Sequence, residues 1–207
     1  MSERSANYFV LDGVDGCGKS TQTRQLADRL EKQGTQVDAI AEPGSNTVAL
    51  TLRELLLDPR IELLPETEVD LFTAARRELA HRVIRPALAA GNTIVSDRSW
   101  VSSVAMQGFG RGLDVNDIIE QSKRAIGDLF LPDALVIIDV PVELAEERVA
   151  YRGIAKDRFE KERKDFFTRA RDGYLWVAEK FDGIVVEGSG AIEAVHSNVC
   201  EALGVAT

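Results

Sequence analysis

The sequence reads Gly13-Val14-Asp15-Gly16-Cys17-Gly18-Lys19-Ser20 between an apolar run and a helical pattern. This octapeptide fits G-x-x-x-x-G-K-[ST], in which glycines permit a tight turn whose backbone N–H groups converge on one anion. The helix that follows adds the positive end of its dipole. The octapeptide therefore predicts a loop that binds the phosphates of a nucleotide, with Lys19 along the β- and γ-phosphates and the Ser20 hydroxyl as a ligand of Mg²⁺.

Apolar runs alternate with helical periods along the rest of the chain. Strands are predicted at Tyr8–Leu11, Val37–Ile40, Thr93–Ser96, Ala134–Val140 and Ile184–Val186. Helices are predicted at Ser20–Gln33, Val48–Leu57, Glu66–Ala90, Val115–Gly127, Glu143–Arg152, Phe159–Phe181 and Ala191–Leu203. Short β-branched runs are typical of strands that are buried on both faces, and their alternation with helices predicts a parallel sheet. We expect an α/β three-layer sandwich with a five-stranded parallel sheet and helices on both faces.

Length, composition and charge restrict the possible classes of protein. The 207 residues fit one domain, and their formal net charge of −9 argues against a general nucleic-acid binder, whose surface is usually basic. No apolar stretch approaches the roughly 18 residues that a membrane span needs. The polar N-terminus does not resemble a signal peptide, and two distant cysteines, Cys17 and Cys200, form no disulfide framework. We expect a cytoplasmic protein without nucleic-acid or membrane partners.

A second group of charged residues follows the third predicted strand. Ser96-Asp97-Arg98 ends that strand, and ligands of open α/β sheets bind at the carboxyl ends of the strands. Asp97 could hold Mg²⁺ through water, and Arg98 could bind a second phosphate, as phosphoryl transfer requires. Asp139, at the end of the fourth strand, is either another carboxylate near Mg²⁺ or merely a strand end. The guanine-reading N-K-x-D sequence of GTPases is absent.

Taken together, these motifs resemble the thymidylate kinase family of P-loop nucleoside monophosphate kinases. The resemblance runs from about Tyr8 to Phe181 and rests on several motifs in order. They are Phe9-Val10-Leu11-Asp12-Gly13-Val14-Asp15-Gly16-Cys17-Gly18-Lys19-Ser20-Thr21-Gln22, Glu42-Pro43-Gly44, Leu52-Arg53-Glu54-Leu55-Leu56-Leu57, Phe72-Thr73-Ala74-Ala75-Arg76, Val83-Ile84-Arg85-Pro86-Ala87-Leu88, Ser96-Asp97-Arg98, Ser102-Ser103-Val104-Ala105-Met106-Gln107-Gly108, Gly110-Arg111-Gly112-Leu113, Arg152-Gly153 and Asp157-Arg158-Phe159-Glu160. The resemblance implies the P-loop NTPase fold with a small lid at about residues 152–158, within one kinase domain over residues 1–207.

The resemblance also implies a reaction, the transfer of the γ-phosphoryl group of ATP to dTMP with Mg²⁺, and a homodimer. In the family, the aromatic residue that matches Phe72 stacks on thymine, and the arginine that matches Arg76 donates to the edge of the base. The arginine that matches Arg98 binds the dTMP phosphate, and the carboxylate that matches Asp15 accepts the sugar hydroxyl. The position that carries an arginine in the loop of some members is Gly16 here, so the catalytic cation should come from the lid, as Arg152, Lys156 or Arg158.

The complete set of implied site residues falls into four groups. The catalytic group is Lys19, Asp15, Arg98, Arg152 and Arg158. The ATP-binding group is Gly13, Gly16, Gly18, Lys19, Ser20, Thr21 and Lys156. The group that binds the acceptor is Asp15, Glu42, Pro43, Phe72, Arg76, Arg98, Ser102, Ser103, Met106, Gln107 and Phe159. The metal group is Ser20, Asp97 and Glu160.

Three departures from the family pattern surround the predicted acceptor pocket. Ser99 stands where an aromatic residue is usual, Met106 where a tyrosine is frequent, and Ala41 where an arginine commonly precedes Glu-Pro-Gly. Another pyrimidine monophosphate as acceptor therefore stays open, and so does a nucleotide-binding paralogue without catalysis. Cys17 is interpreted as a small side chain that fills its loop, although a helix N-terminus can also activate a thiol.

The acidic net charge leads to a further expectation. Both substrates are polyanions, and the acidic surface as a whole repels them. Six cations should therefore converge on one cleft, with the acidic excess elsewhere. They are Lys19, Arg76, Arg98, Arg152, Lys156 and Arg158.

Overall fold

The protein folds around one five-stranded, wholly parallel sheet with the strand order β2-β3-β1-β4-β5. The structure, a computed structural model, describes residues 6–153, 157–160 and 162–206. The strands are β1 (Tyr8–Asp12), β2 (Val37–Ala41), β3 (Thr93–Asp97), β4 (Ala134–Asp139) and β5 (Ile184–Glu187). All five lie within a residue or two of their predicted positions, and the predicted fold class is confirmed.

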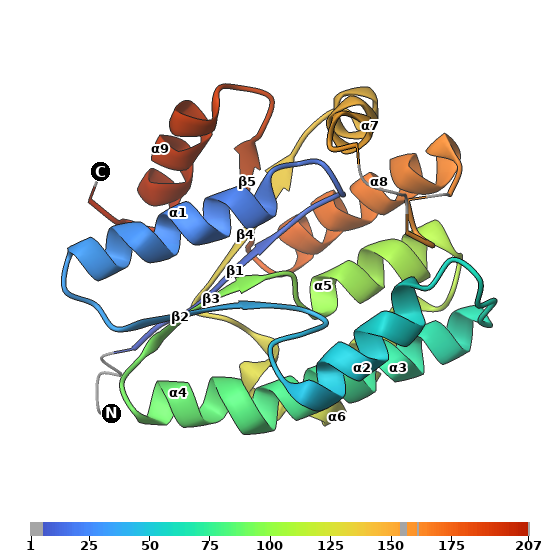
Figure 1. The fold of residues 1–207 in the computed structure, drawn as a ribbon, viewed down its shortest axis with the longest axis horizontal. Coiled ribbons are helices and arrows are strands. Elements are labelled where there is room, and N and C mark those ends of the chain that lie inside the picture. The colour runs from blue at the N-terminus through green and yellow to red at the C-terminus, as the bar shows by residue number, and fades with distance from the viewer. Residues whose placement is uncertain (1–5, 154–156, 161, 207) are drawn as a thin grey trace.

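Helices cover both faces of this sheet (Figure 1). The α-helices in the described ranges are α1 (Lys19–Lys32), α2 (Thr47–Leu57), α3 (Pro65–Leu79), α4 (Arg85–Ala89), α5 (Trp100–Ser103), α6 (Val115–Ile126), α7 (Val142–Tyr151), α8 (Lys164–Lys180) and α9 (Ile192–Ala202). Two π-helical segments, η1 (Ala80–Ile84) and η2 (Val104–Gly110), and a 3₁₀ turn, η3 (Gly127–Phe130), complete them. Helices α1 and α9 pack on one face, while α4 and α8 pack on the other. No helix in these ranges has both the length and the apolar character that crossing a membrane requires.

The central and edge strands differ in burial. Every residue of β1 is buried, and so are most residues of β3 and β4. Strands β2 and β5 lie at the two edges, and Ile184 and Val185 of β5 are 37% and 48% exposed. The prediction that all five strands are buried on both faces is therefore wrong for the edges, since an edge strand lacks a neighbour on one side.

The long helix predicted at Glu66–Ala90 runs through α3, η1 and α4 without a break. Its middle turn is π-helical and ends just before Pro86. Proline has no N–H to donate and its ring crowds the preceding turn, which is a physical reason for widening the helix there.

Two helical segments differ from prediction. Residues 100–110, for which no helix is predicted, form α5 and η2. Burial of Val101 and Val104 against the core stabilises these helices. The pattern does not predict them because its apolar residues do not follow one clear period. Helix α8 begins at Lys164 and not at Phe159. Phe159 instead lies in a turn whose carboxylate, Asp157, accepts hydrogen bonds from the N–H groups of Phe159 and Glu160 at 2.9 Å.

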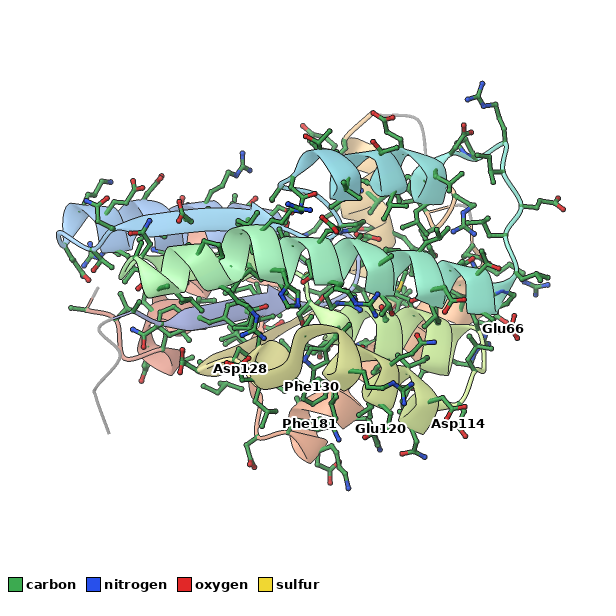
Figure 2. The ribbon with its side chains drawn as sticks, turned by 90° about the horizontal axis from the view of Figure 1, so that it is seen from below. Glu66, Asp114, Glu120, Asp128, Phe130 and Phe181 are labelled. Carbon is green, nitrogen blue, oxygen red and sulfur yellow. The ribbon has the colours of Figure 1, made fainter. Side chains whose placement is uncertain are left out.

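An aromatic cluster joins the helices beneath the sheet. Trp100 stacks on Phe130 at 4.1 Å between ring centroids and meets Phe181 edge-on at 5.0 Å. Figure 2 shows Phe130 and Phe181 close together, with Glu66, Asp114, Glu120 and Asp128 along the surface around them. These four acidic side chains belong to exposed residues of α3, α6 and the segments that flank α6, so part of the acidic excess lies on this outer surface.

Candidate active site

The loop Gly13–Ser20 joins β1 to α1 at the carboxyl edge of the sheet. Gly13, Gly16 and Gly18 all have positive φ, at 147°, 87° and 100°, which glycine adopts without strain. A Cβ atom at Gly13 would lie 2.5 Å from the carbonyl oxygen of Ile138. Helix α1 begins at Lys19, so the last two residues of the octapeptide form its first turn. The positive end of its dipole therefore faces the loop, as predicted from the octapeptide.

Cys17 is buried within this loop and is not disulfide-bonded. Its burial raises the pKa of the thiol, and this effect is only partly offset by the nearby charge of Lys19. A buried thiol with a raised pKa is inert at neutral pH. The geometry therefore favours the interpretation of Cys17 as a filler of the loop over that of a reactive thiol.

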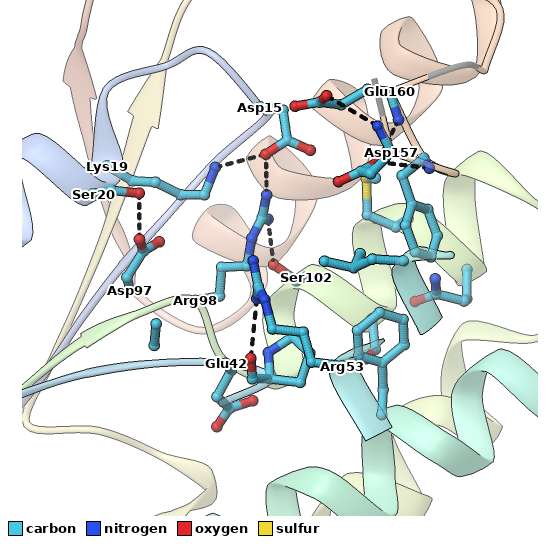
Figure 3. A pocket seen from close by; sticks show the side chains of 18 of the residues that line it. Asp15, Lys19, Ser20, Glu42, Arg53, Asp97, Arg98, Ser102, Asp157 and Glu160 are labelled. Carbon is cyan, nitrogen blue, oxygen red and sulfur yellow. Dashed lines mark hydrogen bonds and ion pairs between the residues drawn. The ribbon is translucent and has the colours of Figure 1, made fainter. Parts of the chain in front are cut away.

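Asp15 is paired both with Lys19 of the loop and with Arg98, which follows β3 (Figure 3). The Nζ atom of Lys19 lies 3.2 Å from Oδ1 of Asp15, and the same carboxylate oxygen is ion-paired with Arg98. Burial of the carboxyl group raises its pKa, but the charges of Arg98 and Lys19 outweigh burial and hold the pKa well below its usual range. Asp15 is therefore an anion that holds two cations at the junction of the loop and β3.

The position of Arg98 is fixed by several neighbours. Its backbone adopts φ 77°, which is uncommon for a residue with a side chain. Its Nη1 atom donates to Oγ of Ser102 at 2.9 Å and to the Tyr174 hydroxyl at 3.1 Å. The buried Asp12 lies beside this group and accepts from the Ser102 hydroxyl at 2.8 Å and the Ser99 N–H at 3.0 Å. Residues from β1, α5 and α8 thus hold one guanidinium group.

Ser20 and Asp97 form the part of the site that fits a divalent cation. The Ser20 hydroxyl donates to Oδ2 of Asp97, while Oδ1 of Asp97 is buried and accepts no hydrogen bond from the described residues. Hydroxyl and carboxylate oxygens are the ligands that Mg²⁺ prefers, usually one or two from the protein together with substrate phosphates. No cluster of three or more acidic, histidine or cysteine residues suited to a metal occurs within the described ranges.

Glu160 and Asp139, the other two carboxylates considered for the metal, are both paired with arginine side chains. Glu160 is ion-paired with Arg152 and lies across the pocket from Ser20 and Asp97 (Figure 3). Asp139 binds both Nε and Nη2 of Arg171 at 2.7 Å. Since each carboxylate is occupied by an arginine, Ser20 and Asp97 are the better placed members of the predicted metal group.

A cavity of about 190 Å³ opens beside this charged junction. Asp15, Lys19 and Arg98 line it together with the apolar Phe72 and Phe159, whose ring centroids are 5.8 Å apart. Further predicted residues line the same cavity: Ser20, Glu42, Pro43, Asp97, Ser102, Ser103, Met106, Gln107, Arg152 and Glu160. The cavity therefore combines flat apolar surfaces with cations, as a nucleotide requires.

A larger cavity of about 520 Å³ is lined by the loop and the start of α1. Gly16, Gly18, Lys19, Ser20 and Thr21 line it, and Asp15, Lys19, Ser20 and Arg152 are shared with the first cavity. Arg148 of α7 also lines it and donates to the carbonyl oxygens of Gly188 at 3.0 Å and Ser189 at 3.4 Å. Two cavities thus meet at Lys19, whose ammonium group can reach an anion in either one.

Arg76, predicted to bind the acceptor, and Arg158, predicted as a catalytic cation of the lid, line neither cavity. Arg76 is buried, and its Nε donates to Glu42 at 2.8 Å. Arg158 is ion-paired with the buried Glu68 and donates to the Leu56 carbonyl at 2.9 Å. Buried carboxylates thus hold the side chains of Arg76 and Arg158 away from the cavities. The expected convergence of cations is found for Lys19, Arg98 and Arg152, and it is wrong for Arg76 and Arg158. Lys156 lies outside the described residues. Gly13 lines neither cavity, and its positive φ allows the backbone turn at the start of the loop.

Sequence patterns did not identify every residue of the site, and Arg53 and Tyr174 are two examples. Arg53 of α2 lines the smaller cavity and donates to the Pro43 carbonyl at 3.0 Å. Tyr174 of α8 is buried and contacts Arg98. Arg53 belongs to one of the motifs that carry the family resemblance, which could have identified it, whereas Tyr174 follows from no local pattern.

The fold and the cavities define a class of protein. A phosphate loop at the carboxyl edge of a parallel sheet is suited to the phosphates of a nucleotide, and here a second cavity shares Lys19 with the cavity along the loop. This arrangement is that of a P-loop nucleotide kinase, a phosphotransferase.

Comparisons with known proteins identify the family within this class. The sequence model of the family described as thymidylate kinase matches residues 11–199, and the chain belongs to that family. A thymidylate kinase of Pelotomaculum thermopropionicum is 39% identical over 94% of this chain and 91% of its own length. One of Citrifermentans bemidjiense is 40% identical over 95% and 90%. The crystal structure of thymidylate kinase from Ehrlichia chaffeensis covers 97% of this chain and 99% of its own, with a TM-score of 0.78 and 28% identity.

Proposed function

We propose that the protein transfers the γ-phosphoryl group of ATP to dTMP and releases ADP and dTDP. The observation that carries this proposal is the meeting of two cavities at Lys19, one along the phosphate loop and one lined by Phe72 and Arg98. Membership of the thymidylate kinase family supports the choice of both substrates. Because the cavities adjoin, donor and acceptor phosphates can react directly, in line and without a covalent enzyme intermediate.

The charged residues suggest how the transfer is promoted. Lys19 and the lid residue Arg152 line both cavities and are suited to stabilise the negative charge that develops on the transferring group. Ser20 and Asp97 would hold Mg²⁺, which supplies further positive charge to the phosphates when it is bound. Arg98 and Arg53 both face the smaller cavity and are the candidates to bind the phosphate of the acceptor.

Asp15 and the aromatic residues would orient the acceptor nucleoside. Asp15 is anionic and lies between Lys19 and Arg98, so it can accept a hydrogen bond from a sugar hydroxyl beside the reacting phosphate. Phe72 and Phe159 offer flat apolar contact for a base. Glu42, Pro43, Ser102, Ser103, Met106 and Gln107 complete the proposed acceptor pocket.

The experiment that tests the proposal is a measurement of kcat/KM with Mg-ATP across a panel of nucleoside monophosphates. We expect a clear preference for dTMP. Comparable turnover of several pyrimidine monophosphates would favour the second candidate, a nucleotide kinase with altered acceptor choice. That candidate is motivated by Ala41 and Met106, which line the cavity where the family usually has arginine and tyrosine. ATP binding without ADP release for any acceptor would instead indicate a non-catalytic paralogue.

We also propose the assembly and compartment. Residues 1–207 form one kinase domain with a lid at about 152–158. Val48, Leu50 and Leu55 of α2 are exposed apolar side chains, which supports a homodimer in which a second copy covers them, and light scattering would measure its mass. Cys17 and Cys200 are both free, as expected of a protein in the reducing cytoplasm.

A further inference from the structure

Glu68 of α3 is a buried carboxylate with three partners from two separate segments. Its side chain is 1% exposed. Its Oε2 accepts hydrogen bonds at 3.1 Å from Nε2 of Gln107 and from Nε of Arg111, and its Oε1 lies 3.0 Å from Nη2 of Arg111. Arg158, at the end of the proposed lid, is ion-paired with the same Oε1. Glu68 therefore holds Gln107 of η2, Arg111 directly after η2, and Arg158 at the end of the proposed lid.

The contact with Glu68 determines the orientation of the Gln107 side-chain amide. A carboxylate paired with two guanidinium groups only accepts hydrogen bonds, so the amide nitrogen of Gln107 must be the end that faces Glu68. The carbonyl oxygen then points away from Glu68. Gln107 lines the smaller cavity together with Phe72 and Met106, and no described residue donates to its Oε1 in a hydrogen bond.

We propose that Glu68 is a positioning residue that sets the base selectivity of the kinase by holding the Gln107 carbonyl toward the acceptor base. This inference rests on the proposed function and assigns a determinant of its selectivity. A carbonyl oxygen in that position accepts a hydrogen bond from the N3–H group that thymine and uracil share. Cytosine has an unprotonated acceptor at N3, so it would place two acceptors against each other and leave Gln107 unpaired. Loss of a buried hydrogen bond of this kind gives strong discrimination.

The decisive variant is Glu68→Gln. A glutamine at position 68 can donate as well as accept, so the Gln107 amide can rotate by half a turn and present its nitrogen to the cavity. That nitrogen could donate to N3 of cytosine. We expect the ratio of kcat/KM for dCMP to that for dTMP to rise about tenfold or more, as expected for one buried hydrogen bond. The ratio of dTMP to dUMP should stay constant, since both bases carry N3–H.

Three further variants separate this role from a merely structural one. In a Gln107→Leu background, Glu68→Gln should leave the dCMP-to-dTMP ratio unchanged, because the residue through which it acts is gone. Arg158→Met removes another partner of Glu68 and should leave that ratio unchanged, because the hydrogen bond between Glu68 and Gln107 remains. Glu120→Gln changes an exposed carboxylate of α6 and should match the wild type throughout.

The outcomes that overturn the inference are distinct from failure of the proposed function. A folded Glu68→Gln variant with the wild-type dCMP-to-dTMP ratio refutes it, and so does an equal effect in the Gln107→Leu background. If Glu68→Gln does not fold, the Gln107→Leu variant becomes the test. The inference then requires that Gln107→Leu raise the dCMP-to-dTMP ratio of kcat/KM, and an unchanged ratio refutes it. Wild-type protein that does not phosphorylate dTMP refutes the proposed function itself, before any variant is compared.

Discussion

The hydroxyl group of Tyr174 lies 3.1 Å from Nη1 of Arg98. The same hydroxyl lies 3.0 Å from Oγ of Ser102, which in turn donates to the buried Asp12. Tyr174 comes from α8 and Arg98 from the end of β3, so this contact joins the layer of helices to the carboxyl edge of the sheet. It restricts the guanidinium group proposed to bind the acceptor phosphate.

Tyr174→Phe should therefore raise the KM for dTMP. The substitution keeps the buried ring and removes one hydrogen bond to a charged group, so we expect roughly a three- to tenfold increase. Steady-state kinetics at saturating Mg-ATP measure it. The matched control is Tyr151→Phe, because Tyr151 is 94% exposed and should give wild-type kinetics. An unchanged KM in a folded Tyr174→Phe variant would show that Ser102 and Asp15 suffice to orient Arg98.

Lys19→Ala should reduce kcat strongly. Lys19 is the cation shared by both cavities, and loss of one charge stabiliser in a water-poor site costs roughly 10²–10³ in rate. Lys32→Ala removes a cation from the exposed end of the same helix and serves as the control. Single-turnover assays with both variants measure the chemical step. Wild-type turnover by Lys19→Ala would exclude the role given to this residue.

Arg53→Gln should weaken binding of the acceptor and not of ATP. Arg53 lines the smaller cavity and is absent from the larger one, so the KM for dTMP should rise while the KM for ATP stays within a factor of about two. A rise of about tenfold corresponds to one charge-assisted hydrogen bond. The control Arg77→Gln removes an exposed cation from α3. Parallel increases in both KM values would place Arg53 in a general structural role.

Sequence patterns predict the parts of the site that are local in the chain. The loop Gly13–Ser20 and the pair Asp97–Arg98 each follow a buried strand, so their neighbours in sequence are also their neighbours in space. The whole five-stranded sheet follows from the same alternation. The retention of Arg76 by Glu42, 34 positions earlier, depends instead on how α3 packs against the loop after β2. A cation motif alone cannot distinguish a side chain that faces a cavity from one held by a buried carboxylate.

Arg53 and Tyr174 show the converse case, in which residues that no sequence pattern assigns to the site belong to it. The run Leu52–Leu57 carries an arginine and a glutamate next to each other, and a short helical period does not tell which of them faces a cavity. Tyr174 follows a regular apolar spacing in α8 and is indistinguishable from a core residue until its hydroxyl is seen beside Arg98. Long-range packing, and not local propensity, determines both positions.

Removal of the divalent cation tests the pair formed by Ser20 and Asp97. A chelator should abolish turnover, and added Mg²⁺ should restore it. Asp97→Asn keeps the size of the side chain but removes its charge, so the Mg²⁺ concentration for half-maximal rate should rise about 10- to 100-fold. Titration of Mg²⁺ at fixed ATP measures this shift, with Asp117→Asn on exposed α6 as the control. An unchanged Mg²⁺ requirement would remove Asp97 from the metal site.

Asp15 should also govern part of the pH dependence of stability. Its pKa in the folded protein is held below the usual value of 3.8, because Arg98 and Lys19 outweigh the effect of burial. A lowered pKa contributes stability that is fully present above the unfolded value and is lost as the pH falls through the folded value. The free energy of unfolding of Asp15→Asn should therefore lie about 1–3 kcal/mol below that of the wild type from pH 7 to about pH 5. The gap should shrink below about pH 4, where the carboxylate of the unfolded chain takes up its proton, and should be lost as the pH falls through the folded value.

Urea unfolding at a series of pH values measures this gap. Asp28→Asn, an exposed carboxylate on α1, is the matched control and should give almost no gap at any pH. A gap for Asp15→Asn that widens toward acid pH would mean that burial dominates and raises the pKa, contrary to the pairing with Arg98. The gap in unfolding free energy narrows toward acid pH in the first case and widens in the second. One pH titration therefore distinguishes a carboxylate held as an anion by its cations from one that burial keeps neutral.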